Sequence, residues 1–95
     1  MLSSIGIYTR NDPQALFRYL SKLQTNTDPT KLEILLWVDN DDHKVSSEFY
    51  TLRKYIRKGL NIKVFINPPL ASIQEVSDWL KTQASHPYGF RDNTK

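Results

Sequence analysis

Hydrophobic and polar positions alternate in blocks that predict three strands, each followed by a helix. Short apolar runs typical of strands lie at 4–8, 32–38 and 61–66. After each run, apolar residues recur every three or four positions, which is the spacing of one helical face, in segments beginning near residues 13, 46 and 72. The order is therefore βαβαβα, and the connections between strands are long enough for parallel crossovers.

Residues with known capping behaviour mark the ends of the three predicted helices. Asp12 before Pro13 is typical of a helix start, because aspartate accepts from free backbone N–H groups and proline fits the first turn. Gly59 is placed to end the second helix. Ser72 and Glu75 have the spacing of a capping box at the start of the third helix.

The nearly continuous apolar run from Leu32 to Val38 predicts a strand covered on both faces in a parallel sheet. Right-handed crossovers then give a three-layer, half-Rossmann α/β fold with strand order 3-2-1. We expect one domain over residues 1–85 and a polar C-terminal tail at 86–95 that frays at its end. Ligands of such folds bind beyond the carboxyl ends of the strands, where the loops 9–12, 39–43 and 67–71 lie.

Composition excludes several classes of site. The chain has 95 residues and no cysteine, so it has no disulfide framework, thiolate zinc site or cysteine nucleophile, which favours a reducing, cytoplasmic setting. No apolar run is long enough for a membrane span, and we expect no signal peptide. His43 and His86 lack metal-ligand spacing, and no Gly-x-Ser-x-Gly nucleophile elbow occurs.

The net charge of +3 comes from basic residues in the second half of the chain. Their centre is a predicted helix that carries Arg53, Lys54, Arg57 and Lys58, where residues four apart are neighbours. We interpret this cluster first as a solvated helix face. The alternative is a binding site for phosphate, for an anionic membrane surface or for nucleic acid. We rank nucleic acid last among the partners, because no recognised nucleic-acid-binding motif accompanies the charge.

The acidic run Asp39-Asn40-Asp41-Asp42 ends the buried second strand, where a ligand would lie. Carboxylates at that position accept hydrogen bonds from a ribose or a base, or coordinate Mg²⁺ or Mn²⁺. The alternative is that these residues turn the chain and cap the next helix. Position alone favours neither interpretation.

The loop after the first strand combines a hydroxyl, a guanidinium and an amide in Thr9, Arg10 and Asn11, next to a helix N-terminus. Such a group suits a diphosphate. The glycines of a dinucleotide fingerprint and the lysine of a P-loop are both absent. The alternative interpretation leaves Arg10 solvated and Thr9 bonded to the loop backbone.

Two segments, SIGIYTRNDPQAL at 4–16 and LEILLWVDNDD at 32–42, resemble the opening of a family 2 glycosyltransferase of the GT-A fold. The Thr-Arg-Asn loop with its following proline is the specific part. The resemblance implies a pocket for a nucleotide-sugar, most often a UDP-sugar. It would place Thr9, Arg10 and Asn11 near the nucleotide and Asp39 and Asn40 at its base or ribose. Asn67-Pro68-Pro69 would form the third side of the pocket, with Pro68 at its centre.

The resemblance covers about residues 3–84, which would correspond to the N-terminal, nucleotide-binding half of a family member. Family members continue into a fourth strand that ends in a metal-binding Asp-x-Asp, and then into an acceptor half with the catalytic base. We expect both to be missing, so catalytic residues stay unassigned. Asp41 is the one candidate ligand for Mn²⁺ or Mg²⁺.

A missing fourth strand would leave the outer edge of the first strand open beside Ile5 and Ile7. Open edges pair with other chains, so we expect a homodimer or a second polypeptide there. Two functional hypotheses follow. The first is a glycosyltransferase-like protein that binds a nucleotide-sugar, truncated or completed by assembly. The second is a non-catalytic protein-interaction module that uses the edge of the first strand.

Overall fold

A parallel four-stranded sheet forms the centre of the protein in the computed structural model, which describes residues 2–94. Its strands are β1 (Ser3–Thr9), β2 (Leu32–Asp39), β3 (Asn61–Asn67) and β4 (Tyr88–Asp92), in the order β3-β2-β1-β4. The helices are α1 (Pro13–Asn26), the short 3₁₀ helix η1 (Pro29–Lys31), α2 (His43–Ser46), α3 (Phe49–Arg57) and α4 (Ile73–Gln83). The predicted α/β fold and the order 3-2-1 of the first three strands are confirmed.

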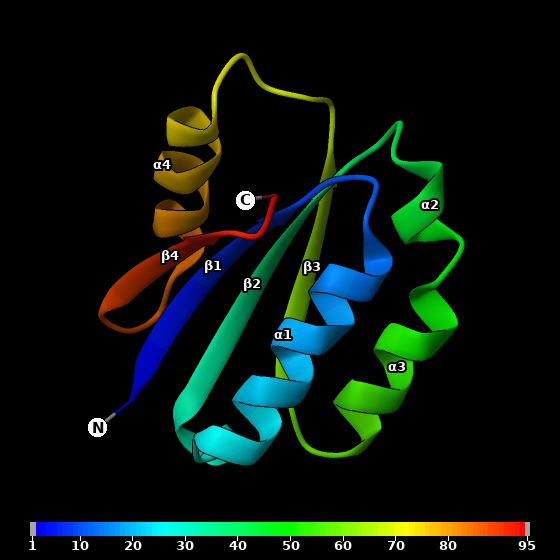
Figure 1. Ribbon diagram of the computed structural model, residues 1–95. Coiled ribbons are helices and arrows are strands. Elements are labelled where there is room, and N and C mark those ends of the chain that lie inside the picture. Colours follow the sequence, from blue (N-terminus) through cyan, green and yellow to red (C-terminus); the bar gives the residue numbers. More distant parts are fainter. Residues whose placement is uncertain (1, 95) are drawn as a thin grey trace.

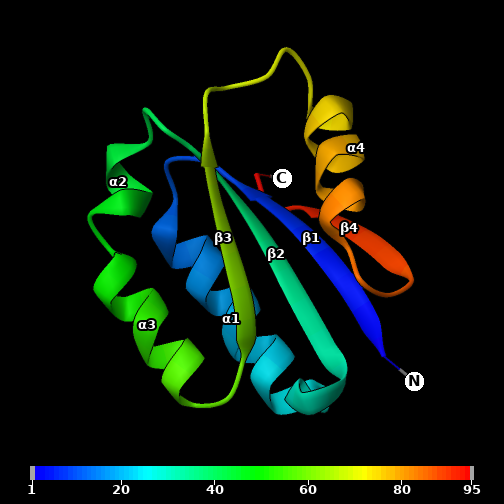
Figure 2. The same cartoon turned by 180° about the vertical axis from the view of Figure 1, so that it is seen from behind.

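Helices cover both faces of the sheet, as Figures 1 and 2 show. On one face α1, α2 and α3 bury Leu16, Leu20, Leu23, Val45 and Leu52 against the strands. On the other face α4 packs Val76 and Leu80 on Leu35 and Trp37 of β2. Seven of the eight residues of β2 are therefore buried, which explains its continuous apolar run. No helix within residues 2–94 is long and apolar enough to cross a membrane.

The predicted starts of α1 and α4 and the predicted end of α3 agree with the observed caps, whereas the start predicted near residue 46 is wrong, because α3 begins at Phe49. The Asp12 carboxylate accepts from the N–H of Ala15, and the Ser72 hydroxyl accepts from the N–H of Glu75. Gly59 follows α3 with φ +111°, a left-handed conformation that glycine adopts without strain. The sequence pattern did not predict α2, a single turn of four residues that one capping side chain stabilises.

The expected frayed tail is wrong over Tyr88–Asp92, because these residues form β4. This strand pairs in parallel with β1 from Ser4 opposite Tyr88 to Tyr8 opposite Asp92. Its aromatic residues, Tyr88 and Phe90, pack into the cluster under α4. The edge of β1 is therefore closed, and the predicted pairing of β1 with a second polypeptide loses its physical basis. Lys95, the end of the predicted tail, lies outside the described residues.

A close approach between β1 and β4 depends on a glycine. The Tyr88 ring lies across Gly6, where an added Cβ would be 2.3 Å from the Tyr88 hydroxyl oxygen. That hydroxyl also donates to the carbonyl oxygen of Ser77 in α4, at 3.1 Å. Gly6 therefore makes room for the side chain that joins β4 to α4.

At the amino end of the sheet, a buried carboxylate joins three strands to the loop before β4. The Glu33 carboxylate accepts from Ser4 Oγ at 2.8 Å, Lys63 Nζ at 2.8 Å and the N–H of Ser85 at 3.0 Å. Burial alone would raise the pKa of Glu33, but bonds from Lys63, Ser85 and Ser4 outweigh it and lower the pKa to about 2. The carboxylate therefore stays charged inside the fold.

Replacing Gly6 by alanine should lower the free energy of unfolding by about 1 to 3 kcal/mol, because Tyr88 must move to admit the methyl group. Gly89→Ala is the matched control, since nothing lies within 4 Å of a Cβ added there. Urea unfolding of both variants measures the difference. Equal stability of the two variants would contradict the predicted clash.

Acid should weaken the fold through Glu33. The pKa of this group is 4.5 when unfolded and about 2 when folded, so its contribution is present above pH 4.5 and disappears as the pH falls toward 2. The contribution at neutral pH is on the order of 3 kcal/mol. Urea unfolding near neutral pH and near pH 3 should show a smaller pH dependence in Glu33→Gln than in the parent. An unchanged dependence would exclude this role.

Candidate functional site

The loops after β1 and β2 meet at the carboxyl edge of the sheet, as predicted for neighbouring parallel strands. Arg10 Nη1 lies 2.8 Å from Asp39 Oδ2 and 2.5 Å from Asp41 Oδ1. A second bond joins Arg10 Nη2 to Asp41 Oδ2 at 3.3 Å. One guanidinium therefore bridges two of the predicted acidic residues.

Asp39 is the buried centre of this group, with 2% of its side chain exposed. Its Oδ1 accepts from Trp37 Nε1 at 2.8 Å. Its Oδ2 accepts from the Tyr8 hydroxyl at 2.7 Å and from Arg10. Three donors from β1, its following loop and β2 compensate for the loss of water around this carboxylate.

These contacts shift the pKa values of Tyr8, Arg10 and Asp41. Burial raises the pKa of Tyr8, and its hydrogen bond to Asp39 raises it further, so Tyr8 remains a donor. Hydrogen bonds to Asp41 and then Asp39 raise the pKa of Arg10. The same Arg10 contact lowers the pKa of Asp41. The site therefore combines one cation with ionised and neutral oxygen groups.

Asp42 has a structural task that ties the two loops together. It is 1% exposed, and its Oδ1 accepts from the N–H of Val45 at 3.1 Å to cap α2. Its Oδ2 accepts from the N–H of Asn11 at 2.8 Å. Asn11 has φ +55°, a left-handed conformation that asparagine tolerates better than most residues. For Asp42, the interpretation as a turning and capping residue is confirmed.

The other predicted site residues lie around this network without joining its side-chain bonds. Thr9 is fully buried, and its Oγ1 has no hydrogen-bond partner among the described residues. Asn40 is exposed, and its N–H donates to the carbonyl of Asn67 at 2.9 Å, which joins the loops after β2 and β3. Pro68 is exposed directly after β3. The three loops therefore share one edge of the sheet.

The structure adds two aromatic residues that the sequence pattern had not assigned to the site, Tyr8 and Trp37. Trp37 precedes Asp39 by two positions on β2, so both side chains lie on the same face of the strand. Tyr8 lies opposite Trp37 in the register of β1 and β2. The i, i+2 spacing of Trp37 and Asp39 could have indicated that Trp37 lies at the site. The apolar neighbours of Trp37 instead favoured the prediction of a core residue.

A fourth strand also reaches this edge, which corrects the expectation that it is missing. Asp92 is the last residue of β4, and the next residue, Asn93, donates its N–H to the carbonyl of Tyr8 at 2.9 Å. Thr94 donates its N–H to Asp92 Oδ1 at 3.1 Å. The run Asp92-Asn93-Thr94 thus stands at the carboxyl end of the fourth strand.

The acidic residues do not form a ready metal site. Within residues 2–94, no group of three or more His, Cys, Asp or Glu side chains is placed to hold a metal ion. The guanidinium of Arg10 occupies the space between Asp39 and Asp41. Binding of Mn²⁺ or Mg²⁺ by Asp41 therefore stays a prediction, and it requires Arg10 to move away first.

Comparison with known proteins relates the fold to one enzyme. Neither a family model nor a curated protein matches the sequence. The crystal structure of S. aureus TarS 1-349 matches with a TM-score of 0.78 and 21% identity, over 98% of this chain and 27% of that chain. The crystal structure of S. aureus TarS 1-349 in complex with UDP-GlcNAc matches with a TM-score of 0.72 and 18% identity, over 98% and 26% of the two chains.

A further structure of S. aureus TarS matches with a TM-score of 0.70 and 19% identity, over 98% of this chain and 16% of that chain. TarS is a glycosyltransferase, so the likeness shows a glycosyltransferase-like fold. The chain spans 27% or less of the TarS chains that it matches.

Replacing Asp42 by alanine should lower the free energy of unfolding by about 1 to 3 kcal/mol, because the N–H groups of Asn11 and Val45 both lose their acceptor. The neighbouring Asp41→Ala is the control, since its ion pair with Arg10 is exposed and contributes little to stability. Thermal or urea unfolding compares the two variants. A larger loss in Asp41→Ala would refute this division of roles.

Proposed function

We propose that this chain binds a nucleotide-sugar, with UDP as its nucleotide part, at the carboxyl edge of the sheet. The observation that carries the proposal is Asp39, a buried carboxylate at the end of β2 surrounded by oriented donors. The proposed site comprises the residues that the resemblance implied: Thr9, Arg10, Asn11, Asp39, Asn40 and Pro68. The TarS complex with UDP-GlcNAc supports the same ligand class.

Asp39 has capacity for one more donor. A carboxylate offers about four lone-pair positions, and Trp37, Tyr8 and Arg10 occupy three of them. The remaining position on Oδ1 suits an N–H group of a base or an O–H group of a ribose. Because Trp37 and Tyr8 hold the carboxylate in place, the ligand does not have to organise it.

Arg10 supplies the group for the diphosphate. Its side chain is 34% exposed and that of its partner Asp41 is 53% exposed, so their ion pair is weak. Arg10 therefore leaves Asp41 at little cost when a ligand with more negative charge arrives. The planar guanidinium donates two parallel bonds to a diphosphate. Movement of Arg10 also frees Asp41 to bind the Mn²⁺ or Mg²⁺ that would accompany the diphosphate.

In this proposal the chain provides the donor-binding part of a glycosyltransferase. Sugar transfer needs a base that deprotonates the acceptor and an electrophilic partner for the leaving diphosphate. No described residue is assigned as that base, so turnover would depend on assembly with further protein. The alternative of an interaction module at the β1 edge is no longer favoured, because β4 pairs with that edge.

Titration with UDP, followed by two-dimensional amide NMR, tests the site. Shifts should cluster in residues 9–11 and 39–42, and Mn²⁺ should tighten binding. Arg10→Gln should weaken UDP binding about tenfold but uridine binding much less, because uridine lacks the diphosphate. Asp39→Asn should weaken both ligands, since it removes the charged acceptor.

Arg57→Gln is the matched control for charge, because Arg57 is exposed at the end of α3 and its replacement removes the same unit of charge. It should leave UDP affinity within about twofold of the parent. Absence of shifts in both loops at high UDP concentration would overturn the proposal. Equal weakening by Arg10→Gln and Arg57→Gln would reduce the binding to general charge attraction.

A further inference from the structure

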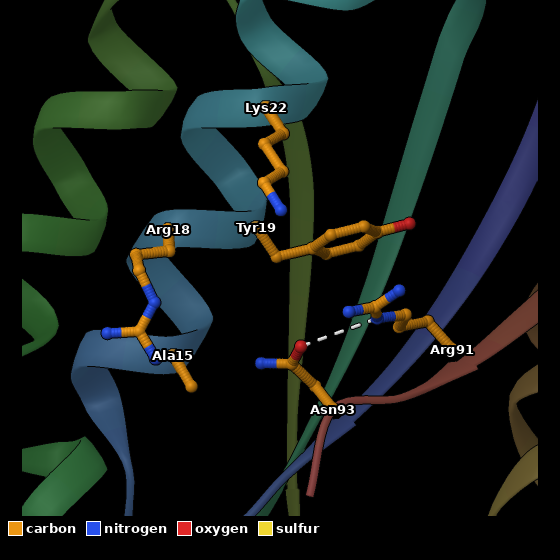
Figure 3. Close-up of a pocket in the computed structure, with 6 residues that line it drawn as sticks. All are labelled: Ala15, Arg18, Tyr19, Lys22, Arg91 and Asn93. Carbon is orange, nitrogen blue, oxygen red and sulfur yellow. Dashed lines mark hydrogen bonds between the residues drawn. The ribbon is translucent and has the colours of Figure 1, made fainter. Parts of the chain in front are cut away.

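A polar cavity lies between α1 and β4, and no side chain of the Arg10 and Asp39 network lines it. Its volume is about 120 Å³, room for roughly four water molecules and therefore for one small oxyanion. Figure 3 shows the residues that line it: Ala15, Arg18, Tyr19 and Lys22 from α1, and Arg91 and Asn93 from β4 and the segment after it. None of these residues belongs to the proposed nucleotide site.

Three cations surround this cavity, and no ion pair within residues 2–94 neutralises them. Arg18 and Lys22 lie one turn apart on α1, so both side chains reach the same side of the helix. Arg91 approaches from β4. In that part of the chain the ion pairs belong to other cations, Arg10 and Lys63. An anion in the cavity would relieve the mutual repulsion of the three cations.

The cavity is ordered by contacts of Arg91. The Arg91 guanidinium lies over the Tyr19 ring, 4.4 Å from its centroid. Its Nε donates to Asn93 Oδ1 at 3.4 Å, which is the dashed bond in Figure 3. These contacts hold the guanidinium at the cavity wall before any ligand is present, which lowers the cost of ordering it.

Asn93 supplies an independent sign that an acceptor belongs in the cavity. The residue is 7% exposed, and its Nδ2 has no hydrogen-bond partner among the described residues. Its Oδ1 accepts from Arg91, and Nδ2 faces the side where Ala15 and Arg18 lie (Figure 3). A buried donor without an acceptor is costly, and an anionic oxygen would satisfy it.

We propose that this cavity binds a phosphate group, separately from the diphosphate of the nucleotide. Two guanidinium groups, one ammonium group and one amide N–H₂ group match the oxygens of a tetrahedral dianion. The phosphate is either free inorganic phosphate or the end of a phosphomonoester. This inference does not rest on the nucleotide proposal, because the two sites share no residue.

Titration of the 95-residue chain with inorganic phosphate, and separately with methyl phosphate, tests the site by amide NMR. We expect saturable binding with shifts at Ala15, Tyr19 and Asn93. The double variant Arg18→Gln with Lys22→Gln should weaken phosphate binding at least about tenfold. Arg18 and Lys22 are exposed and do not belong to the buried face of α1, so the fold should be retained. Tighter binding of methyl phosphate identifies a phosphomonoester as the ligand, and tighter binding of inorganic phosphate identifies the free ion.

Two controls distinguish this site from general charge attraction and from the nucleotide site. The double variant Arg57→Gln with Lys58→Gln removes the same charge from the end of α3 and should change the dissociation constant by less than about twofold. Arg10→Gln should also leave phosphate binding unchanged, although it weakens UDP binding. The proposal is overturned if binding does not saturate, if the α3 variant weakens it equally, or if Arg10→Gln abolishes it while the α1 variant does not.

Discussion

A carboxyl group inside a protein needs donors from neighbouring elements around it, and β2 carries such a group near each end. Glu33 near its amino end joins β1, β3 and the loop before β4. Asp39 at its carboxyl end joins β1 and the loop after it. Between them β2 is apolar and covered on both faces. The sheet is thus fixed laterally at both ends by the same strand that forms its core.

The two carboxylates differ in what surrounds them. Glu33 is closed in by a lysine, a hydroxyl and a backbone amide, all of which belong to the fold itself. Asp39 has one long, partly exposed donor, Arg10, which is shared with the exposed Asp41. The amino end of β2 is therefore enclosed by the fold, while the carboxyl end has a donor that is partly exposed to solvent.

Local signals made most of the fold predictable. Asp12, Gly59 and Ser72 act on the backbone within a few residues, and β2 is apolar enough to identify its burial directly. The proximity of Arg10 and Asp39 was also predictable, because the carboxyl ends of neighbouring parallel strands lie at the same edge of the sheet. The predicted neighbours at this edge were therefore found together.

What could not be predicted depends on distant partners. β4 has only five residues in a polar context, and it is stabilised by the open side of β1 and the face of α4 rather than by its own pattern. The partners of Glu33 could not be predicted, because Lys63 and Ser85 lie far from it in the sequence. Asp42 could equally have been a ligand or a cap, and only the positions of Asn11 and Val45 decide.

The place of β4 has a consequence for how the chain assembles during synthesis. β1 leaves the ribosome before β2 and β3, and its outer partner β4 follows all three. Until β4 emerges, β1 and β2 are able to pair while the backbone of β1 still has one unpaired side. The nascent chain therefore passes through a stage in which the outer side of β1 is open to pairing with neighbouring chains, and pairing with β4 ends that stage.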